Sequence, residues 1–118
     1  MMAAIPLYQA GQSIWLEDAT RGLLEPGGLD RYVVEGAVTG LTSNPAVFAG
    51  AIAGGGLYDP QARALAGCGL RGEELFVELV VDDFRRAAQL LLPLWDATGG
   101  RDGWVSLEVS PRLAYDAP

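Results

Sequence analysis

The sequence predicts an α/β fold in which helices cover a small parallel sheet. Three short segments rich in β-forming residues, at 13–17, 37–42 and 104–109, alternate with segments of helical periodicity. Strands that alternate with helices pair in parallel through right-handed crossovers. Half of the 118 residues are hydrophobic and 19% are charged, which is typical of a folded domain and excludes a disordered chain. We expect a single domain over 1–118.

The first strand is predicted at 13–17, where apolar and β-forming residues cluster. A helical turn is expected to begin at Asp18 and to fail at the Pro-Gly-Gly run 26–28. A helix then resumes over 29–35. Gly36 fits the left-handed position that closes a helix without a steric penalty.

The second strand, 37–42, leads into a helix with a clear start signal. Asn44 is the expected N-cap, and Pro45 falls in the first turn, where a missing N–H costs nothing. This helix is expected to end in the glycines 54–56. A further short helix is expected over 59–66, opened by an Asp-Pro pair.

The longest predicted helix begins at Glu73 and carries one apolar face. Its apolar residues recur in steps of three and four, which is the spacing of a buried helix face. They are Phe76, Val80, Phe84, Ala87, Leu91 and Leu94. Pro93 is expected to kink the last turns or to split them off. The third strand follows over 104–109.

Alternation along the strands indicates which side chains face the helices. Successive strand residues point to opposite faces. The apolar alternate residues should lie under the helices, namely Ile14, Leu16, Val105, Leu107 and Val109. Glu17 and Glu108 then point to the other face, near the strands' carboxyl ends. In the second strand the sequence does not decide between the two sets. If the sheet curls into a barrel, both glutamates line its mouth and can share acid and base roles.

Charge and composition exclude several classes of function. The net charge is −7, with eight arginines, no lysine and no histidine, so nothing predicts a nucleic-acid partner. Cys68 is the single cysteine, which excludes an intramolecular disulfide and a cysteine metal site. Charges interrupt the apolar stretch 75–95, so we expect no membrane span, and the start of the chain makes a poor signal peptide. We therefore expect a cytoplasmic protein.

Two motifs carry a resemblance to a known family. They are GLTSNPAVF at 40–48 and GWVSLEVSPRLAYD at 103–116. In order and spacing they resemble the N-terminal part of a transaldolase, over about residues 12–116. The resemblance implies the N-terminal portion of a (β/α)8 TIM barrel. It also implies a pentose phosphate pathway enzyme that moves a dihydroxyacetone unit from sedoheptulose 7-phosphate to glyceraldehyde 3-phosphate. The reaction runs through a lysine Schiff base, without cofactor or metal.

The resemblance also suggests roles for individual residues. Glu108 matches an acid that works with a water molecule to move protons during imine formation and hydrolysis. Asn44 matches an asparagine that hydrogen-bonds the dihydroxyacetone unit, and Thr42 and Ser43 belong to the same wall. Glu17 aligns with a first-strand aspartate that acts as the base, although glutamate is one methylene longer. Whether Glu17 or Asp18 fills this role stays open, since alternation turns Asp18 away.

The residue that would form the covalent bond is absent. In the family the Schiff-base lysine lies on a fourth strand, and this chain has no lysine at all. We therefore expect the chain by itself to be inactive. The alternatives are a non-catalytic interaction module, which associates with itself or with a C-terminal barrel fragment, and a gene fragment that does not fold stably.

Overall fold

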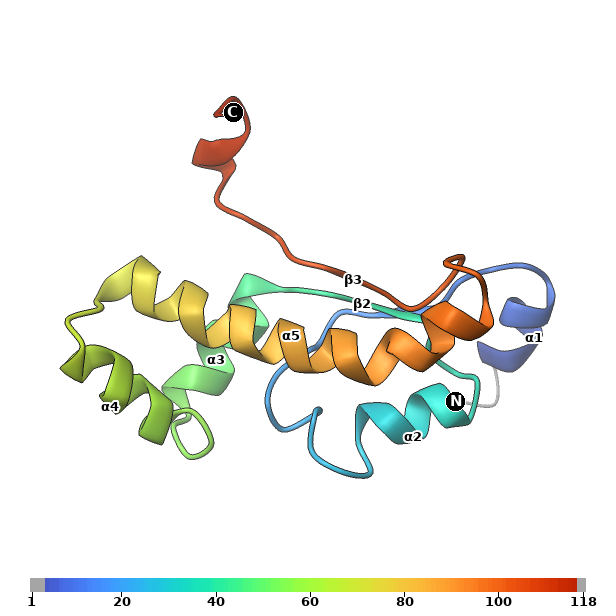
Figure 1. The fold of residues 1–118 in the computed structure, drawn as a ribbon, viewed down its shortest axis with the longest axis horizontal. Helices are drawn as coiled ribbons and strands as arrows, with labels where there is room; N and C mark the ends of the chain where they lie inside the picture. The colour runs from blue at the N-terminus through green and yellow to red at the C-terminus, as the bar shows by residue number, and fades with distance from the viewer. Residues whose placement is uncertain (1–3, 117–118) are drawn as a thin grey trace.

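The structure is a computed structural model that describes residues 4–116. Three short strands alternate with helices along the chain (Figure 1). In order, the elements are α1 (Ala4–Gln9), β1 (Trp15–Leu16), α2 (Leu29–Val34), β2 (Gly40–Thr42), α3 (Pro45–Ala53), α4 (Asp59–Gly67), α5 (Gly72–Ala97), β3 (Trp104–Ser106) and the 3-10 turn η1 (Pro111–Leu113). Helix α1 has no counterpart in the sequence-based prediction.

The strands form one parallel sheet in the order β1-β2-β3. Trp15, Gly40 and Trp104 lie side by side across it, as do Leu16, Leu41 and Val105. This confirms the predicted α/β fold class. The arrangement is that expected of the N-terminal portion of a (β/α)8 barrel.

The strands are shorter than predicted because side chains replace part of the backbone ladder. Before β2, the Ile14 N–H donates to the Thr39 hydroxyl at 2.9 Å, and the Thr39 N–H donates to the Ile14 carbonyl at 2.7 Å. On the other side, the Gly103 N–H donates to the Thr39 carbonyl at 2.8 Å. Thr39 thus holds the amino ends of all three strands together.

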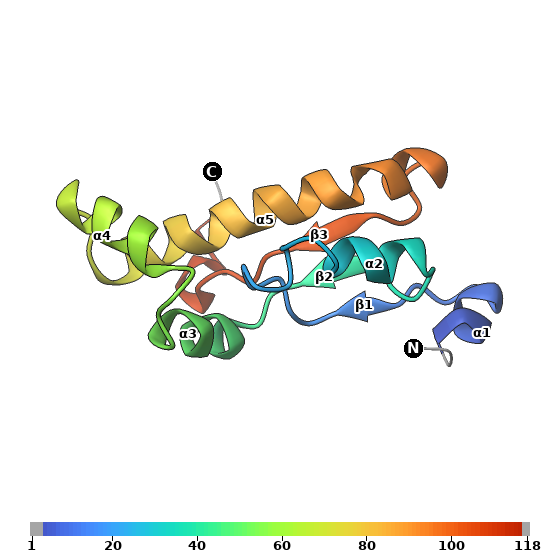
Figure 2. The same ribbon diagram turned by 90° about the horizontal axis from the view of Figure 1, so that it is seen from below.

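The helices cover one face of this sheet. Helix α5 runs along β3 and also contacts α2 and α4 (Figures 1 and 2). Its predicted apolar face is confirmed: the four central residues Val80, Phe84, Ala87 and Leu91 are buried, and Phe76 and Leu94 pack against them. The Phe48 ring of α3 lies 5.8 Å from the Phe84 ring, which joins α3 to the same core.

The predicted start and stop signals mostly hold. Gly36 has φ +67°, the left-handed conformation expected at the end of α2. Helix α4 ends at Gly67. Pro93 does not split α5, which continues to Ala97. A proline so near the end of a helix removes a single hydrogen bond, and the remaining turn still packs on the core through Leu94.

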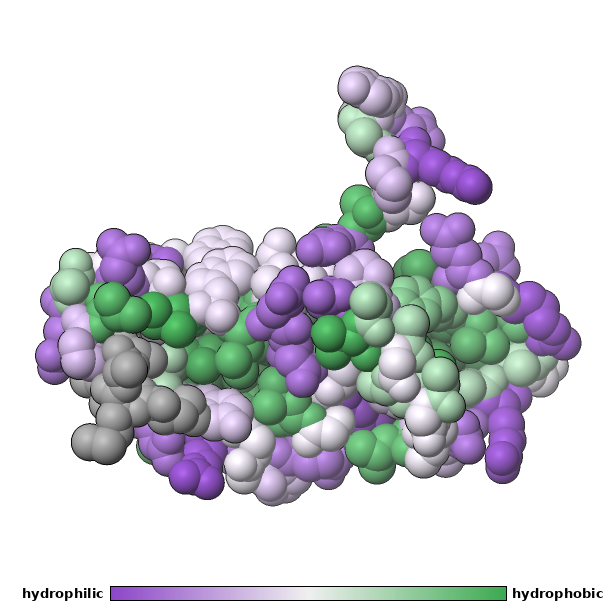
Figure 3. Space-filling view, turned by 180° about the vertical axis from the view of Figure 1, so that it is seen from behind, coloured by the Kyte–Doolittle hydropathy of each residue, from purple (hydrophilic) through white to green (hydrophobic). Residues whose placement is uncertain are grey.

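Within residues 4–116 no helix lies across the opposite face of the sheet, although Trp95 of α5 contacts Trp104 at its edge. Leu41 is fully buried on the helix side, so its neighbours Gly40 and Thr42 face away, which settles the alternation that the sequence left open in β2. Trp15 and Trp104 are 41% and 51% exposed. A Cβ on Gly40 would lie 2.5 Å from the Trp15 ring, so only glycine lets this indole lie against β2. Figure 3 shows several apolar patches on the surface.

A buried polar network joins the loop after β1 to α4 and α5. Nε of Arg21 donates to Asp83 Oδ1 at 2.9 Å, and the other guanidinium nitrogens donate to the Leu57 carbonyl and to Gln61. Burial raises the pKa of the Tyr58 hydroxyl, and Asp83 raises it further. This hydroxyl therefore stays protonated and donates to Asp83 Oδ2 at 2.7 Å. Both oxygens of Asp83, which is fully buried, are satisfied.

A second buried carboxylate lies where the chain enters β3. Asp102 is 2% exposed and accepts hydrogen bonds from the Ser13 and Tyr8 hydroxyls and from Arg101 Nε. Its own N–H donates to the Thr98 hydroxyl at 3.0 Å. Burial raises the pKa of the Asp102 carboxyl, but the three donors outweigh this effect and bring the pKa below its usual value. This cluster fastens α1 and the start of β1 to the loop after α5.

Candidate functional site

Two of the predicted site residues meet at the carboxyl end of the sheet. Glu17 directly follows β1, and Asn44 lies two residues after β2. The Asn44 side-chain Nδ2 donates to Glu17 Oε1 at 3.2 Å. The glutamate is exposed and the asparagine is half-buried, so the pair lies at the protein surface.

Asn44 is also the N-cap of α3, as the sequence predicts. Its backbone is extended, with φ −131° and ψ 111°, and its Oδ1 accepts from the N–H groups of Ala46 and Val47 at 3.0 and 3.4 Å. Pro45 occupies the first turn. The cap fixes where the amide lies relative to the sheet.

Ser43 holds the segment after β3 against the end of β2. Its N–H donates to the Ser106 carbonyl at 2.9 Å, and its hydroxyl accepts from the Glu108 N–H at 2.6 Å. Ser43 is 2% exposed, so its hydroxyl is engaged inside the protein. Thr42, which is half-buried, pairs with Ser106 in the sheet.

Glu108 is therefore placed through its backbone. The residue is exposed and lies two positions beyond β3. It borders a hollow of about 380 Å³ whose other walls include Phe76 and Val80 of α5 and Pro111 of η1. Within residues 4–116 its carboxylate makes no hydrogen bond to Glu17 or Asn44. The structure thus pairs Glu17 with Asn44, and Ser43 holds the backbone of Glu108 two residues beyond the adjacent strand β3.

Asp18, the alternative to Glu17, has a local partner. Its Oδ1 accepts from the Thr20 N–H at 2.8 Å, which closes a short turn after β1. Unlike Glu17, its carboxylate makes no hydrogen bond with Asn44 in the described part of the chain.

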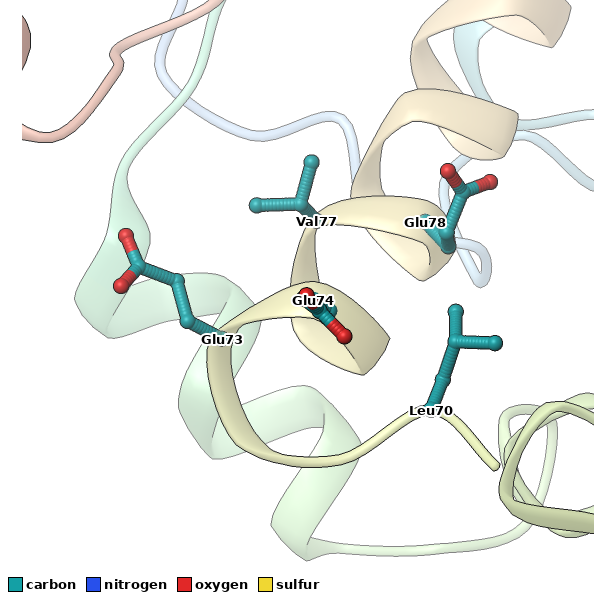
Figure 4. Close-up of a pocket in the computed structure, with 5 residues that line it drawn as sticks. All are labelled: Leu70, Glu73, Glu74, Val77 and Glu78. Carbon is teal, nitrogen blue, oxygen red and sulfur yellow. The ribbon is translucent and has the colours of Figure 1, made fainter. Parts of the chain in front are cut away.

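A second, acidic hollow lies at the start of α5 (Figure 4). It is lined by Leu70, Val77 and the carboxylate-bearing Glu73, Glu74 and Glu78. Two of these glutamates lie in the first helical turn, where the helix dipole stabilises negative charge. This hollow shares Glu73 and Val77 with the hollow beside Glu108, but Glu17, Asn44 and Glu108 do not line it. The helix dipole accounts for the charges of Glu73 and Glu74.

Residues 4–116 contain neither a membrane-spanning helix nor a cluster of metal-binding side chains. No helix there is long and apolar enough to cross a membrane. No group of three or more histidine, cysteine or acidic side chains in that range is placed to hold a metal ion.

Sequence reasoning missed the link from Ser43 to Glu108. A serine after a strand carries no signal for a partner 65 residues away. The link could have been predicted only from the parallel pairing of β2 with β3, whose register places Ser43 beside the segment that follows β3.

Comparison with known proteins assigns the chain to a family. The family described as Transaldolase/Fructose-6-phosphate aldolase matches residues 14–118. The chain belongs to this family. Its matched region contains both predicted motifs and every candidate site residue.

Individual relatives agree with this assignment. The chain is 48% identical over 112 residues to a transaldolase of Thiobacillus denitrificans, covering 90% of this chain and 30% of the relative. It is 46% identical over 110 residues to a transaldolase of Thermobifida fusca, covering 93% and 30%. A transaldolase of Streptomyces avermitilis is 44% identical over 110 residues, covering 93% and 29%. The chain thus spans about 30% of the length of these relatives.

Proposed function

We propose that this chain provides the N-terminal part of a transaldolase active site. The reaction would transfer a dihydroxyacetone unit from sedoheptulose 7-phosphate to glyceraldehyde 3-phosphate. The observation that carries the proposal is the contact between Asn44 and Glu17 at the carboxyl edge of the sheet, beside the strand that leads to Glu108. The carboxyl ends of parallel barrel strands are where barrel enzymes hold their substrates.

Each residue has a role that its position allows. Glu17 is the base that takes the hydroxyl proton lost when the carbon–carbon bond breaks, and Asn44 donates a hydrogen bond to the sugar. Glu108 moves protons, through water, during imine formation and hydrolysis. Asp18 is the weaker candidate for the base, because its carboxylate already closes a turn. The nucleophile is a lysine that this sequence does not contain, so the remaining strands of the barrel must supply it.

A fusion protein tests this function. Residues 1–118 would be joined to the part of the Thermobifida fusca transaldolase that lies beyond the matched region. The fusion should form fructose 6-phosphate from the two substrates, and borohydride should trap its Schiff base. Residues 1–118 alone should do neither. Glu108→Gln in the fusion should lower kcat by about a hundredfold or more, as expected for a lost general acid or base.

Three outcomes would contradict the proposal. They are a folded fusion that lacks activity, a Glu108→Gln variant with full activity, and turnover by residues 1–118 alone.

The second candidate function is an interaction module that pairs with itself or with a separate C-terminal barrel fragment. The open sheet face favours it, because Trp15 and Trp104 remain exposed there, and within residues 4–116 β1 and β3 each pair with a strand on one side only. Light scattering after size-exclusion chromatography tests it. A mass above 12.4 kDa for residues 1–118 supports self-association. A monomer that also fails to bind the Thermobifida fusca remainder rules the module out.

A further inference from the structure

The loop that joins β1 to α2 begins at Glu17 and is anchored four residues later, at Arg21. The segment between these two residues is also held in place. Asp18 Oδ1 accepts from the Thr20 N–H at 2.8 Å, and Ala19 is fully buried in the core under the helices. The position of the Arg21 backbone therefore constrains that of Glu17 through a short segment with contacts of its own.

Arg21 is anchored through both its backbone and its side chain. Its N–H donates to the Tyr58 hydroxyl at 2.8 Å, and its guanidinium carbon lies 4.5 Å from the centre of the Tyr58 ring. Nε donates to Asp83 at 2.9 Å, and the other two nitrogens donate to the Leu57 carbonyl at 3.1 Å and to Gln61 at 2.6 Å. The residue is 8% exposed. These contacts together fit a single position of Arg21.

Stability alone is a weak reason for this arrangement. The cost of removing an arginine and an aspartate from water offsets much of their attraction, so apolar residues of similar volume often stabilise a fold as well or better. What the buried network adds is a fixed geometry. Asp83 comes from the middle of α5 and Tyr58 directly precedes α4, and the Tyr58 hydroxyl donates to Asp83 at 2.7 Å while it accepts from Arg21. The network thus sets the loop after β1 against two helices.

We propose that Arg21, held by Tyr58 and Asp83, is a positioning residue for Glu17. By fixing the loop, it keeps the Glu17 carboxylate at the carboxyl edge of the sheet, where Oε1 accepts from Asn44 at 3.2 Å. Arg21 is buried and its donors are engaged inside the protein, so it acts through the loop and not on a ligand. Its effect on turnover rests on the proposed function, in which Glu17 is the base, but its effect on the position of Glu17 does not.

Tyr58→Phe tests this role with little change of shape. The ring stays, but the Arg21 N–H loses its acceptor and Asp83 loses a donor. In the active fusion kcat should fall by about tenfold or more, because a small displacement of a reacting group is costly. KM should change little, because Glu17 acts on the proton that is lost when the carbon–carbon bond breaks. The Schiff base trapped by borohydride counts the folded sites, so kcat per trapped site is insensitive to partial unfolding.

Two variants serve as references for Tyr58→Phe. Asp102→Asn is the matched control, since it disrupts a buried carboxylate network where the chain enters β3. It should lower the thermal unfolding midpoint and leave kcat per trapped site unchanged. Gln61→Ala removes one acceptor of the guanidinium and should lower kcat by a smaller factor than Tyr58→Phe. If Tyr58→Phe does not fold, Gln61→Ala decides, and an unchanged kcat overturns the proposal.

A double-mutant cycle shows whether the effect runs through Glu17. In a Glu17→Gln background, Tyr58→Phe should lower kcat little further, because the group that the network positions is already lost. Three results would overturn the proposal: full kcat per trapped site in Tyr58→Phe, an equal loss in Asp102→Asn, and the same fold-loss with and without the Glu17 carboxylate.

Nuclear magnetic resonance tests the position of Glu17 without any activity. In ¹⁵N-labelled residues 1–118, Tyr58→Phe should shift the Asn44 side-chain NH₂ signals, which report the contact with Glu17, and leave the Ala46 backbone signal nearly unchanged. Asp102→Asn should leave both in place. Asn44 side-chain signals that do not respond to Tyr58→Phe would contradict the positioning role. Because this readout needs no turnover, an inactive fusion would count against the proposed function alone.

Discussion

Two pairs of acidic residues in this chain have opposite surroundings. Asp83 and Asp102 are 0% and 2% exposed, while Glu17 and Glu108 are exposed at the carboxyl end of the sheet. The buried pair is surrounded by donors from the protein itself. The exposed pair keeps carboxylate oxygens that no group in the described residues occupies.

The difference separates structural acids from candidate site acids. Arg21 and Tyr58 each hold one oxygen of Asp83, and the residue is 0% exposed, so a ligand from solvent does not reach that carboxylate. Glu17 uses one oxygen for the Asn44 amide. Within residues 4–116 no buried side-chain nitrogen or oxygen lacks a partner, so side-chain polar atoms without a partner lie on the surface.

The largest effect is expected at Asp83. Asp83→Ala leaves the buried Arg21 guanidinium without its anion, and losing one partner of a buried ion pair costs about 3–5 kcal/mol. The free energy of unfolding, measured by urea denaturation, should fall by that amount. Asp82→Ala is the matched control, because Asp82 is half exposed and lies 3.9 Å from Arg21. Equal losses for the two variants would show that the buried network is not what matters.

A smaller effect is expected at Asp102. Asp102→Asn turns one acceptor oxygen into an NH₂ group, which then faces either the Ser13 hydroxyl at the Oδ1 position or the Tyr8 hydroxyl and Arg101 Nε at the Oδ2 position. The free energy of unfolding should fall by about 1–3 kcal/mol. Ser13→Ala removes one of these donors and should cause a smaller loss. A neutral result for Asp102→Asn would show that this cluster does not fasten the sheet.

The same residue predicts a pH dependence. The folded-state pKa of Asp102 lies below its ordinary value of 3.8, so its contribution to stability is fully present above pH 3.8. That contribution is lost as the pH falls from 3.8 through the lower folded-state pKa, because the proton then binds the unfolded chain more readily. The unfolding free energy of Asp102→Asn should therefore depend less on pH in this range. Parallel curves for the two proteins would exclude Asp102 as a source of acid sensitivity.

The smallest effect is expected at the exposed acids. Glu17→Gln and Glu108→Gln should each change the free energy of unfolding by less than about 0.5 kcal/mol, since exposed substitutions away from buried networks are nearly neutral. In the active fusion the same changes should lower kcat. A loss of stability above about 1 kcal/mol at either position would show that the residue stabilises the fold, as Asp83 and Asp102 do.

The sequence predicts the framework of this fold well where local rules decide. The step of three and four residues marked the buried face of α5, Asn44 marked the start of α3, and Gly36 marked the end of α2. These signals depend on neighbours within one or two helical turns. They therefore need no knowledge of the tertiary structure.

Other features depend on contacts between distant segments. Asp82 and Asp83 look alike in sequence, but only Asp83 meets Tyr58, 25 residues away. Nothing in the strand pattern indicates that the Thr39 hydroxyl replaces part of the ladder. Strand alternation indicated Glu17, and the family resemblance indicated both Glu17 and Asn44, but neither signal linked the two residues. Their contact with each other emerged only once β1 and β2 lay side by side.

The two tryptophans beside Gly40 have a practical consequence. Trp15 and Trp104 lie beside Gly40 on the open sheet face and are 41% and 51% exposed. Trp95 of α5, the third tryptophan, packs edge-on against Trp104 at the edge of that face, with ring centroids 6.3 Å apart. Any protein segment that comes to lie on this face will displace water from these indoles. The maximum of the tryptophan fluorescence emission should then move to shorter wavelength. The emission therefore reports whether another protein segment covers this face.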